Sequence, residues 1–494
     1  LIAPTASPVV AIGSQAIDQA PLAVKEFAIR TFGENDKLVL VVGIIVLMIP
    51  ISAFIGWLAF RNRTAATVLI ALLGVLGLVA ALADPNASIV SILPSLVAIV
   101  VGVFALGILA DAASTHQLHA NAKTADDVAG AGESVITHEG FAPSRRNILL
   151  GAAAGGAVIS IGGATLANSL INSNGALGRG KLPSPTEAAP ALPSGLQPDV
   201  KGVTPWLTDA KDFYRVDTAI TIPRINANTW KLTIDGMVNK KFTMTYKELL
   251  AMPMVERHIT LACVSNEVGG PYISNGKWQG VLLKDILDKA GVKSGADQLF
   301  STSSNGWTAS TTLADVLDGR DAMIAVGLNG EALPLERGFP ARMLVPGLYG
   351  YVSATKWLTK LEVTTFAKAQ SYWTERKWAD KGPIFTESRV DVPAPLSTVS
   401  SGKVSFAGIA WAQNRGISKV EIRLDGGDWV TTTLAADGGK DTWREWSAQV
   451  DLKSGSHGVE VRATDMTGAV QTEARADPFP KGATGWQLIR FTCS

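Results

Sequence analysis

The chain has 494 residues, 47% of them hydrophobic, and a formal net charge of +1 at pH 7. This length suggests roughly three structural units, and the balanced charge gives no support for nucleic-acid binding. Only two cysteines are present, Cys263 and Cys493, which excludes a disulfide framework and a Cys-x-x-Cys metal site. Because the chain begins at Leu1 and runs directly into apolar sequence, we expect further residues, such as an earlier membrane helix, to precede it.

The N-terminal part contains four apolar stretches that approach the ~20 residues needed to cross a bilayer. They cover residues 38–60, 65–83, 89–110 and 148–170. The first three contain no charged residue or histidine, and the fourth is rich in Gly and Ala, which permit close packing of membrane helices. We therefore predict three transmembrane helices within 38–110 and a fourth within 147–170.

Basic residues between these stretches predict the membrane topology. Arg61 and Arg63 separate the first two spans, and Arg145 and Arg146 precede the fourth. The positive-inside rule then places the loop 111–146 in the cytoplasm, and 1–37 and everything after residue 170 outside it. This topology predicts a multi-pass protein of a bacterial cytoplasmic membrane.

Two shorter signals flank the spans. Residues 144–150, Ser-Arg-Arg-Asn-Ile-Leu-Leu, resemble a twin-arginine export signal, and an ordinary positive-inside anchor fits them equally well. We interpret the segment as an uncleaved anchor. Near the start of the chain, Val24, Phe27, Ala28 and Phe32 fall at helical spacing, which predicts a short amphipathic helix on the membrane surface or against a soluble domain.

The sequence of the second half of the chain is typical of a soluble, globular region. Residues 171–201 are rich in Pro, Gly, Ser and Ala and predict a linker. Within 202–395, short strands at 230–234 and 259–262 and helices at 245–250 and 282–290 predict an α+β domain, with Cys263 in a loop directly after a buried strand. Residues 396–494 alternate at period two with Gly/Asp turns and predict an immunoglobulin-like β-sandwich without an internal Cys pair.

Several motifs follow one another between residues 213 and 358. They are Phe213-Tyr214-Arg215-Val216-Asp217, Ile225-Asn226-Ala227-Asn228-Thr229-Trp230-Lys231-Leu232, Thr260-Leu261-Ala262-Cys263, Trp278-Gln279-Gly280-Val281-Leu282-Leu283, Leu328-Asn329-Gly330-Glu331-Ala332-Leu333-Pro334, Gly338-Phe339-Pro340-Ala341-Arg342, Val345-Pro346-Gly347 and Thr355-Lys356-Trp357-Leu358. In content and order these motifs resemble the sulfite oxidase family of molybdopterin enzymes. The resemblance covers residues 202–494 and implies a sulfite-oxidase-type molybdopterin domain followed by that family's dimerisation-type β-sandwich.

The resemblance implies a molybdenum–molybdopterin cofactor, with Cys263 as the thiolate ligand of the metal. A soft thiolate suits such a centre, and coordination keeps the thiol deprotonated. Cys263 and Arg215 are the implied catalytic residues, with Arg215 beside the open position of the metal. The implied cofactor-binding residues, which supply cations and backbone amides to an anionic phosphate, are Tyr214, Arg215, Val216, Asp217, Cys263, Ser304, Asn305, Arg337, Arg342, Ser353, Ala354, Thr355 and Lys356.

The sequence departs from the family pattern at positions that bear on the substrate. Val264-Ser265-Asn266-Glu267 stands where sulfite-oxidising members carry basic residues, and Glu267 would repel a dianion. Arg337 occupies the position at which the family has a histidine. Ser304 or Asn305 occupies the position at which the family has an aspartate. Oxo transfer from a neutral S-oxide or N-oxide, on a small molecule or a protein, is therefore a credible alternative to oxidation of a small oxyanion.

No second redox centre is evident in the sequence. There is no Cys-x-x-Cys-His motif, and no histidine lies within a span, so we see no haem site. Electrons would come from a separate cytochrome, quinone or membrane subunit, and the membrane region would contact lipid. The resemblance leaves homodimerisation through the β-sandwich open. A different class of function also stays open, namely a catalytically silent envelope module that keeps the fold for binding or assembly.

Overall fold

The computed structural model describes residues 7–84, 87, 89–128 and 177–494. They form two compact units. Unit 1 contains the described residues up to Leu177 together with Thr218–Thr221, and unit 2 contains Gly178–Asp217 and Ile222–Ser494.

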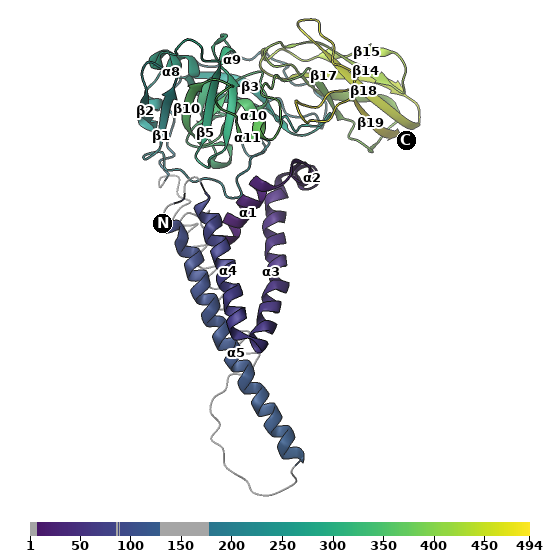
Figure 1. Cartoon of the computed structure of the whole chain (residues 1–494). Helices are drawn as coiled ribbons and strands as arrows, with labels where there is room; N and C mark the ends of the chain where they lie inside the picture. Colours follow the sequence, from purple (N-terminus) through teal and green to yellow (C-terminus); the bar gives the residue numbers. More distant parts are fainter. Residues whose placement is uncertain (1–6, 85–86, 88, 129–176) are drawn as a thin grey trace. The chain divides into compact units, whose positions relative to one another are not determined.

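The described part of unit 1 is helical (Figure 1). Its elements are α1 (Pro8–Gln19), α2 (Leu22–Phe32), η2 (Gly33–Asn35), α3 (Asp36–Arg61), α4 (Arg63–Leu82), η3 (Ile89–Ile92) and α5 (Leu93–Val128). Three helical stretches, Asp36–Arg61, Arg63–Leu82 and Ile89–Asp111, are long and apolar enough to cross a membrane, with mean hydropathies of 3.0, 2.6 and 2.7. They match the first three predicted spans. The fourth predicted span and the twin-arginine motif lie outside the described residues.

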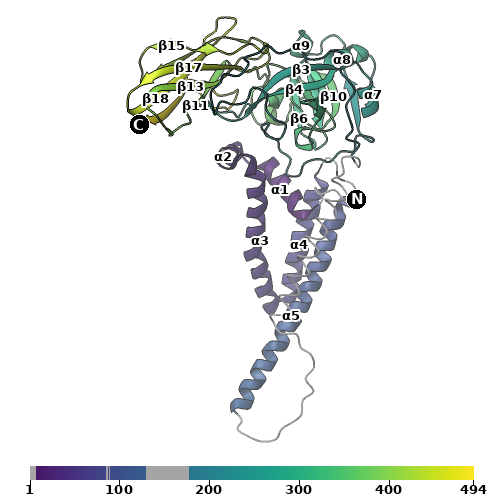
Figure 2. The same ribbon diagram turned by 180° about the vertical axis from the view of Figure 1, so that it is seen from behind.

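Small residues let the helices of unit 1 approach closely. Helix α4 contacts α1, α3 and α5, which lie beside it in both views (Figures 1 and 2). A Cβ on Gly74 would meet the side chain of Ile99, and one on Gly77 would lie 2.9 Å from Pro8. Ala11 of α1 is buried against Ala80 and Ala81 of α4. Helix α2 corresponds to the predicted amphipathic helix, whereas α1 was not predicted.

The α+β domain of unit 2 contains two sheets. One has the order β2-β1-β10-β5-β6, and the other has the order β3-β4-β7-β8, with β9 also paired to β7. Their strands are β1 (Lys231–Gly236), β2 (Phe242–Thr245), β3 (Val255–Ala262), β4 (Ile273–Leu282), β5 (Gln298–Ser303), β6 (Thr308–Thr312), β7 (Met323–Leu328), β8 (Glu331–Ala332), β9 (Arg342–Leu344) and β10 (Leu358–Thr364). Short helical segments connect them, namely α7 (Tyr246–Leu250), α8 (Leu283–Ala290), α9 (Leu313–Leu317), η4 (Leu335–Arg337), α10 (Gly350–Ser353) and α11 (Tyr372–Glu375).

Local sequence signals explain where these elements begin and end. Thr245 and Glu248 form a capping box at the start of α7, so each satisfies a backbone N–H that the helix leaves open. Gly291, with a φ of 67°, ends α8 in the left-handed conformation that glycine adopts without strain. Strand β3 delivers Cys263 to the loop that follows it, as predicted.

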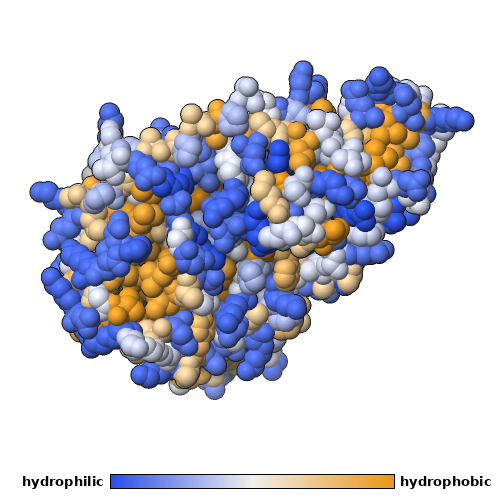
Figure 3. Space-filling view, turned by 90° about the horizontal axis from the view of Figure 1, so that it is seen from above, coloured by the Kyte–Doolittle hydropathy of each residue, from blue (hydrophilic) through white to orange (hydrophobic). Residues whose placement is uncertain are grey.

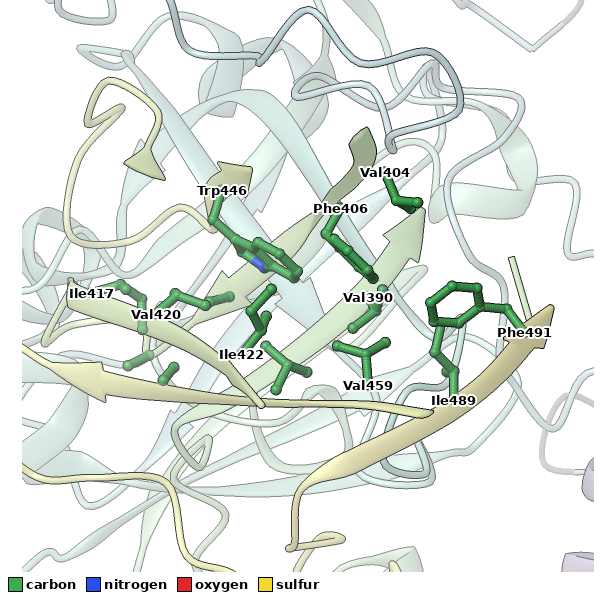
Figure 4. Packing of buried hydrophobic residues seen from close by; sticks show 14 of the residues in the cluster. Val390, Val404, Phe406, Ile417, Val420, Ile422, Trp446, Val459, Ile489 and Phe491 are labelled. Carbon is green, nitrogen blue, oxygen red and sulfur yellow. The ribbon is translucent and has the colours of Figure 1, made fainter. Parts of the chain in front are cut away.

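The β-sandwich follows the α+β domain. One sheet has the order β11-β13-β17-β16 and the other β12-β19-β18-β14-β15. Its strands are β11 (Glu387–Val392), β12 (Thr398–Val399), β13 (Gly402–Trp411), β14 (Ile417–Leu424), β15 (Trp429–Thr431), β16 (Thr433–Leu434), β17 (Arg444–Leu452), β18 (Gly455–Asp465) and β19 (Gln487–Cys493). Phe406, Trp446 and Phe491 meet Ile422 and Val459 in the core between the sheets (Figure 4). The predicted order of apolar helices, α+β domain and β-sandwich is therefore confirmed.

The part of the predicted linker that the structure describes packs against the α+β domain. Glu187 forms a parallel bridge with Val255 at the start of β3. The amide of Gln279 donates to the carbonyl of Pro183 at 2.7 Å, and Arg257 pairs with Glu187. The Pro-rich composition predicted a linker, and its low apolar content gave no sign that polar contacts would attach the segment to a strand. The surface in Figure 3 mixes hydrophilic side chains with apolar patches.

Candidate active site

Cys263 lies immediately after β3, in a loop closed by hydrogen bonds. Its backbone N–H donates to the carbonyl of Tyr272 at 2.9 Å, and its carbonyl accepts from the N–H of Asn266 at 3.1 Å. The side-chain oxygen of Asn266 accepts from the N–H of Tyr272 at 2.7 Å. The loop therefore holds the Cys263 side chain at a fixed place at the end of the strand.

The thiol of Cys263 is half-buried and has one polar neighbour in its own loop. Its Sγ lies 2.9 Å from the hydroxyl of Ser265. Burial raises the pKa of the Cys263 thiol, while hydrogen bonding from Ser265 and the nearby charge of Lys356 act in the opposite direction. A bound metal ion would complete the deprotonation that these groups favour.

A buried arginine and a buried lysine face the same region. Arg342 is 6% exposed, and its guanidinium lies 5.0 Å from the ring centre of Trp278. Its terminal nitrogens donate to the carbonyls of Arg337 and Ala354, whereas its Nε has no hydrogen-bond partner among the described residues. Burial lowers the pKa of Arg342 to about 10 and that of Lys356 to about 8. Both groups therefore remain largely cationic at pH 7.

The carboxylate of Asp217 pairs with two cations, Arg215 and Lys356. These three residues and Arg342 form what is called the cationic cluster below. The Asp217 carboxylate lies 2.9 Å from the Nε of Arg215 and 2.5 Å from the ammonium of Lys356, and the Asp217 side chain is 6% exposed. Lys356 also donates to the carbonyl of Glu336 at 3.3 Å. With Arg342, the four side chains have a net charge of about +2, so the region still attracts an anion.

Tyr214 adds a neutral hydroxyl. Burial raises the pKa of Tyr214 well above its ordinary value, with the Cys263 charge acting in the same direction. The hydroxyl therefore keeps its proton and can donate a hydrogen bond. A Cβ placed on Gly350 would lie 3.7 Å from this hydroxyl and 3.8 Å from the carbonyl of Ala262. Glycine at position 350 thus keeps open the space beside the residue that precedes Cys263.

Several other predicted site residues use their side chains for structure. Ser353 donates to the carbonyls of Leu348 and Tyr349, and Thr355 lies 2.6 Å from Ser301 through their hydroxyls. The side chain of Asn305 accepts from the N–H of Trp307 within the β5–β6 turn. The backbone N–H of Ser304 donates to Trp357, while Val216 and Ala354 have no polar side chain. Ser353, Ala354 and Thr355 directly precede Lys356, and Ser304 is hydrogen-bonded to Trp357, the residue after it.

Arg337 has a structural role that the sequence did not predict. Its guanidinium donates to the carbonyls of Ala210, Lys211 and Tyr214 at 3.1, 3.0 and 3.3 Å. These bonds fix the segment that carries Tyr214, Arg215 and Asp217. The predicted direct contact of Arg337 with a cofactor therefore competes with three existing hydrogen bonds.

Tyr349 also lies near Cys263 and was not among the predicted site residues. Tyr349 is 4% exposed, and its pKa is raised by burial first and also by the charges of Glu387 and Cys263. Ser303 is 3% exposed, and its hydroxyl has no hydrogen-bond partner among the described residues. The motif Val345-Pro346-Gly347, two residues before Tyr349, was the available signal. Within the part of the chain that the structure describes, no group of three or more His, Cys, Asp or Glu side chains could hold a metal ion.

Parts of the chain are similar to known proteins. The family model of the oxidoreductase molybdopterin binding domain matches residues 219–373. The chain is 27% identical over 294 residues to the mitochondrial sulfite oxidase of Macaca fascicularis, covering 49% of this chain and 53% of that protein. It is 25% identical over 316 residues to nitrate reductase [NADH] 1 of Oryza sativa subsp. japonica, covering 51% and 34%. The structure is similar to the sulfane dehydrogenase SoxCD from Paracoccus pantotrophus, with a TM-score of 0.52, 23% identity, and coverage of 58% and 81%.

The α+β domain is therefore a molybdopterin-binding domain of an oxidoreductase. Over about half of its length the chain is similar, at low sequence identity, to a curated sulfite oxidase and a curated nitrate reductase. It spans about half the length of the sulfite oxidase it matches first.

The residues present fit a molybdopterin cofactor. The buried Nε of Arg342 has no partner among the described residues, and such a group calls for a ligand because burial without a hydrogen bond is costly. A single thiolate with no other protein ligand suits a metal whose remaining ligands come from a pterin. The carboxylate of Asp217 is the one member of the cluster that opposes an anionic phosphate.

Proposed function

We propose that this protein is a membrane-anchored molybdenum-cofactor oxidoreductase that carries out two-electron oxo transfer. The observation that carries the proposal is the position of Cys263, a fixed, half-buried thiol near the buried cations of Lys356 and Arg342. When bound, the cofactor would supply a metal centre that exchanges an oxo group and two electrons. In the proposal, Cys263 ligates the metal and Lys356 and Arg342 hold the pterin phosphate.

Other residues of the chain would act on the substrate. Tyr214 keeps its proton and would donate a hydrogen bond to a substrate oxygen, because its pKa is raised. Arg215 would orient an oxygen-bearing substrate and is itself held by Asp217. Trp278 and Phe213 pack edge-to-face, with ring centres 5.3 Å apart, and would exclude water from one side of the site.

We further propose that the substrate is a neutral S-oxide or N-oxide rather than a small oxyanion. In the loop after Cys263, Val264 and Asn266 are buried, Ser265 is hydrogen-bonded to the thiol, and Glu267 is exposed. This loop therefore provides no cation to attract a dianion such as sulfite. A neutral oxide avoids the repulsion from Glu267 and still accepts hydrogen bonds from Tyr214 and Arg215.

The proposed location is the extracytoplasmic side of a bacterial cytoplasmic membrane. The three long apolar helices support membrane anchoring. Arg61 and Arg63 lie at the junction of α3 and α4, and Arg63 pairs at 2.8 Å with Asp111, which follows the apolar part of α5. Charged groups therefore gather at one end of the helices, and the positive-inside rule assigns that end to the cytoplasm. Export through residues 144–150 and electron supply by a separate cytochrome, quinone or membrane subunit belong to the same proposal.

Metal and pterin analysis tests this function. Full-length protein purified in detergent should contain about one molybdenum and one pterin per chain, and should reduce methionine sulfoxide or a simple N-oxide in preference to oxidising sulfite. Cys263→Ser should lose molybdenum and turnover, whereas the matched variant Cys493→Ser, in the β-sandwich, should keep both. Wild-type protein without molybdenum or pterin, expressed in a host that makes the cofactor, would overturn the proposal.

One observation favours a catalytically silent module instead. Asp217 pairs with Lys356 and so offsets the charge that would hold a cofactor phosphate. If the protein is silent, Asp217→Asn should not change its pterin content, which would stay at background. In the enzyme, the same substitution removes a charge that opposes the phosphate, and pterin content should be equal or higher.

A further inference from the structure

The β-sandwich binds the strand that leads to Cys263. Strand β3 is the outer strand of its sheet, and Thr260 lies three residues before the cysteine. The N–H of Thr260 donates to the carbonyl of Asp441 at 2.9 Å, its hydroxyl accepts from the N–H of Trp443 at 2.9 Å, and its carbonyl accepts from the amide of Gln413 at 3.1 Å. All three partners belong to loops of the β-sandwich or residues adjoining its strands. They satisfy groups of an edge strand that would otherwise face solvent.

The β-sandwich also binds the loop after Cys263. Arg389 of β11 donates through Nη1 to the carbonyl of Gly270 at 3.0 Å. Its Nε donates to Asp391 at 2.6 Å and its Nη2 to the hydroxyl of Thr204 at 2.8 Å, so the guanidinium is held in one orientation. The side chain of Arg389 is 12% exposed. A charged donor fixed in this way gives a stronger hydrogen bond than a neutral one.

A second side chain of the β-sandwich packs against the same loop. Gly269 has a φ of +78°, and a Cβ there would lie 2.4 Å from the Nε2 of Gln487. The Oε1 of Gln487 accepts from the N–H of Val390 at 2.6 Å, which ties it to β11. Only glycine combines this backbone conformation with so close an approach.

Side chains along β11 point alternately to the two faces of its sheet, so one strand contacts both the sandwich core and this loop. Val390 faces the core, and its neighbours Arg389 and Asp391 point to the opposite face of the sheet. That opposite face is the one in contact with Thr204 and Gly270. Strand β11 therefore connects the packing of the β-sandwich directly to the geometry of the cysteine loop.

We propose that the β-sandwich positions Cys263, with Arg389 as the main positioning residue after the cysteine and the loops that bind Thr260 as the anchor before it. The thiol is then held from both sides by a part of the protein that carries no proposed cofactor-binding residue. A ligand thiol must be placed within about 0.5 Å for its metal to react efficiently, which gives such an anchor a function. The inference rests on the proposed function only in assigning Cys263 as the metal ligand.

The test compares the reactivity of Cys263 in cofactor-free, full-length protein. The rate of alkylation by a maleimide is measured by peptide mass spectrometry, with the buried Cys493 as the internal reference. Arg389→Gln loses a charged hydrogen bond to the loop, so Cys263 should react roughly tenfold faster, while the rate at Cys493 stays unchanged. Arg423→Gln is the matched control, because Arg423 is also a β-strand arginine paired with a carboxylate, Glu460, and should leave both rates unchanged.

A second measurement separates positioning from general loosening. In molybdenum-loaded protein, Arg389→Gln should shift the g-values of the molybdenum(V) electron paramagnetic resonance signal, which respond to sulfur–metal geometry, and Arg389→Lys should restore them in part. If Arg389→Gln does not fold, Gln487→Ala provides the same comparison at Gly269. Unchanged Cys263 reactivity in folded Arg389→Gln and Gln487→Ala would overturn the inference. Absence of molybdenum would overturn the proposed function alone, since the alkylation result does not depend on the metal.

Discussion

The ammonium of Lys356 lies 2.5 Å from the carboxylate of Asp217, and both side chains are nearly buried. Burial lowers the pKa of Lys356 to about 8, although Asp217 acts in the opposite direction. The charge of Lys356 is therefore present below pH 8 and is lost as the pH rises through that value. An anion held by Lys356 is therefore bound more weakly as the pH rises through this range.

The first prediction follows from this titration. Retention of the pterin cofactor after desalting should decrease between pH 7 and pH 9, by roughly tenfold in affinity if Lys356 supplies the main charge. Lys356→Arg keeps its charge throughout this range and should abolish the decrease. Fluorescence of the oxidised pterin after gel filtration at each pH measures the effect. A decrease of equal size in Lys356→Arg would show that another group titrates.

The second prediction concerns Glu267 in the loop after the cysteine. Glu267→Lys changes the local charge by two units, and at about 10 Å in water this should lower the KM for the sulfite dianion by roughly tenfold. Steady-state assays at low ionic strength measure the change, which salt should suppress. Glu331→Lys, at the exposed strand β8, is the matched charge control and should have no effect. Equal effects of the two variants would point to net charge rather than to this position.

The third prediction concerns Arg337, which is 7% exposed and donates to three carbonyls of the 210–214 segment. Arg337→Gln leaves buried carbonyls without donors and should lower the free energy of unfolding by roughly 2–4 kcal/mol. Thermal denaturation measures this, and exposed Arg490→Gln should change stability by less than about 0.5 kcal/mol. If Arg337 instead acts mainly on the cofactor, the melting temperature of cofactor-free protein will not change.

The fourth prediction concerns the core of the β-sandwich. Phe406 is fully buried and packs against Phe491, with ring centres 5.7 Å apart (Figure 4). Phe406→Ala should destabilise the β-sandwich by about 3–5 kcal/mol, measured as increased proteolysis within residues 387–493. Leu396→Ala, at a side chain that is 86% exposed, should leave proteolysis unchanged. Equal proteolysis of both variants would mean that Phe406 does not support the core.

Some features of this protein follow from short stretches of sequence. Helices α3, α4 and α5 were predictable because about 20 consecutive apolar residues specify a membrane span without reference to the rest of the chain. The end of β3 at Cys263 was predictable from a run of adjacent residues, as were the cap at Thr245 and the stop at Gly291. Such signals are local, so one segment contains all the information.

The tertiary structure decided how the charged residues are used. Lys356 meets Asp217 across 139 positions, Arg337 reaches Ala210 across 127, and Gln413 reaches Thr260 across 153. For each of these side chains, the sequence contains many residues that could serve as a partner. Only the packing of unit 2 selects one of them. The sequence therefore determined the family of the domain and the position of its candidate ligand thiol. The fold determined that Arg337 holds a backbone segment, that Asp217 pairs with Lys356, and that the β-sandwich contacts the loop of Cys263.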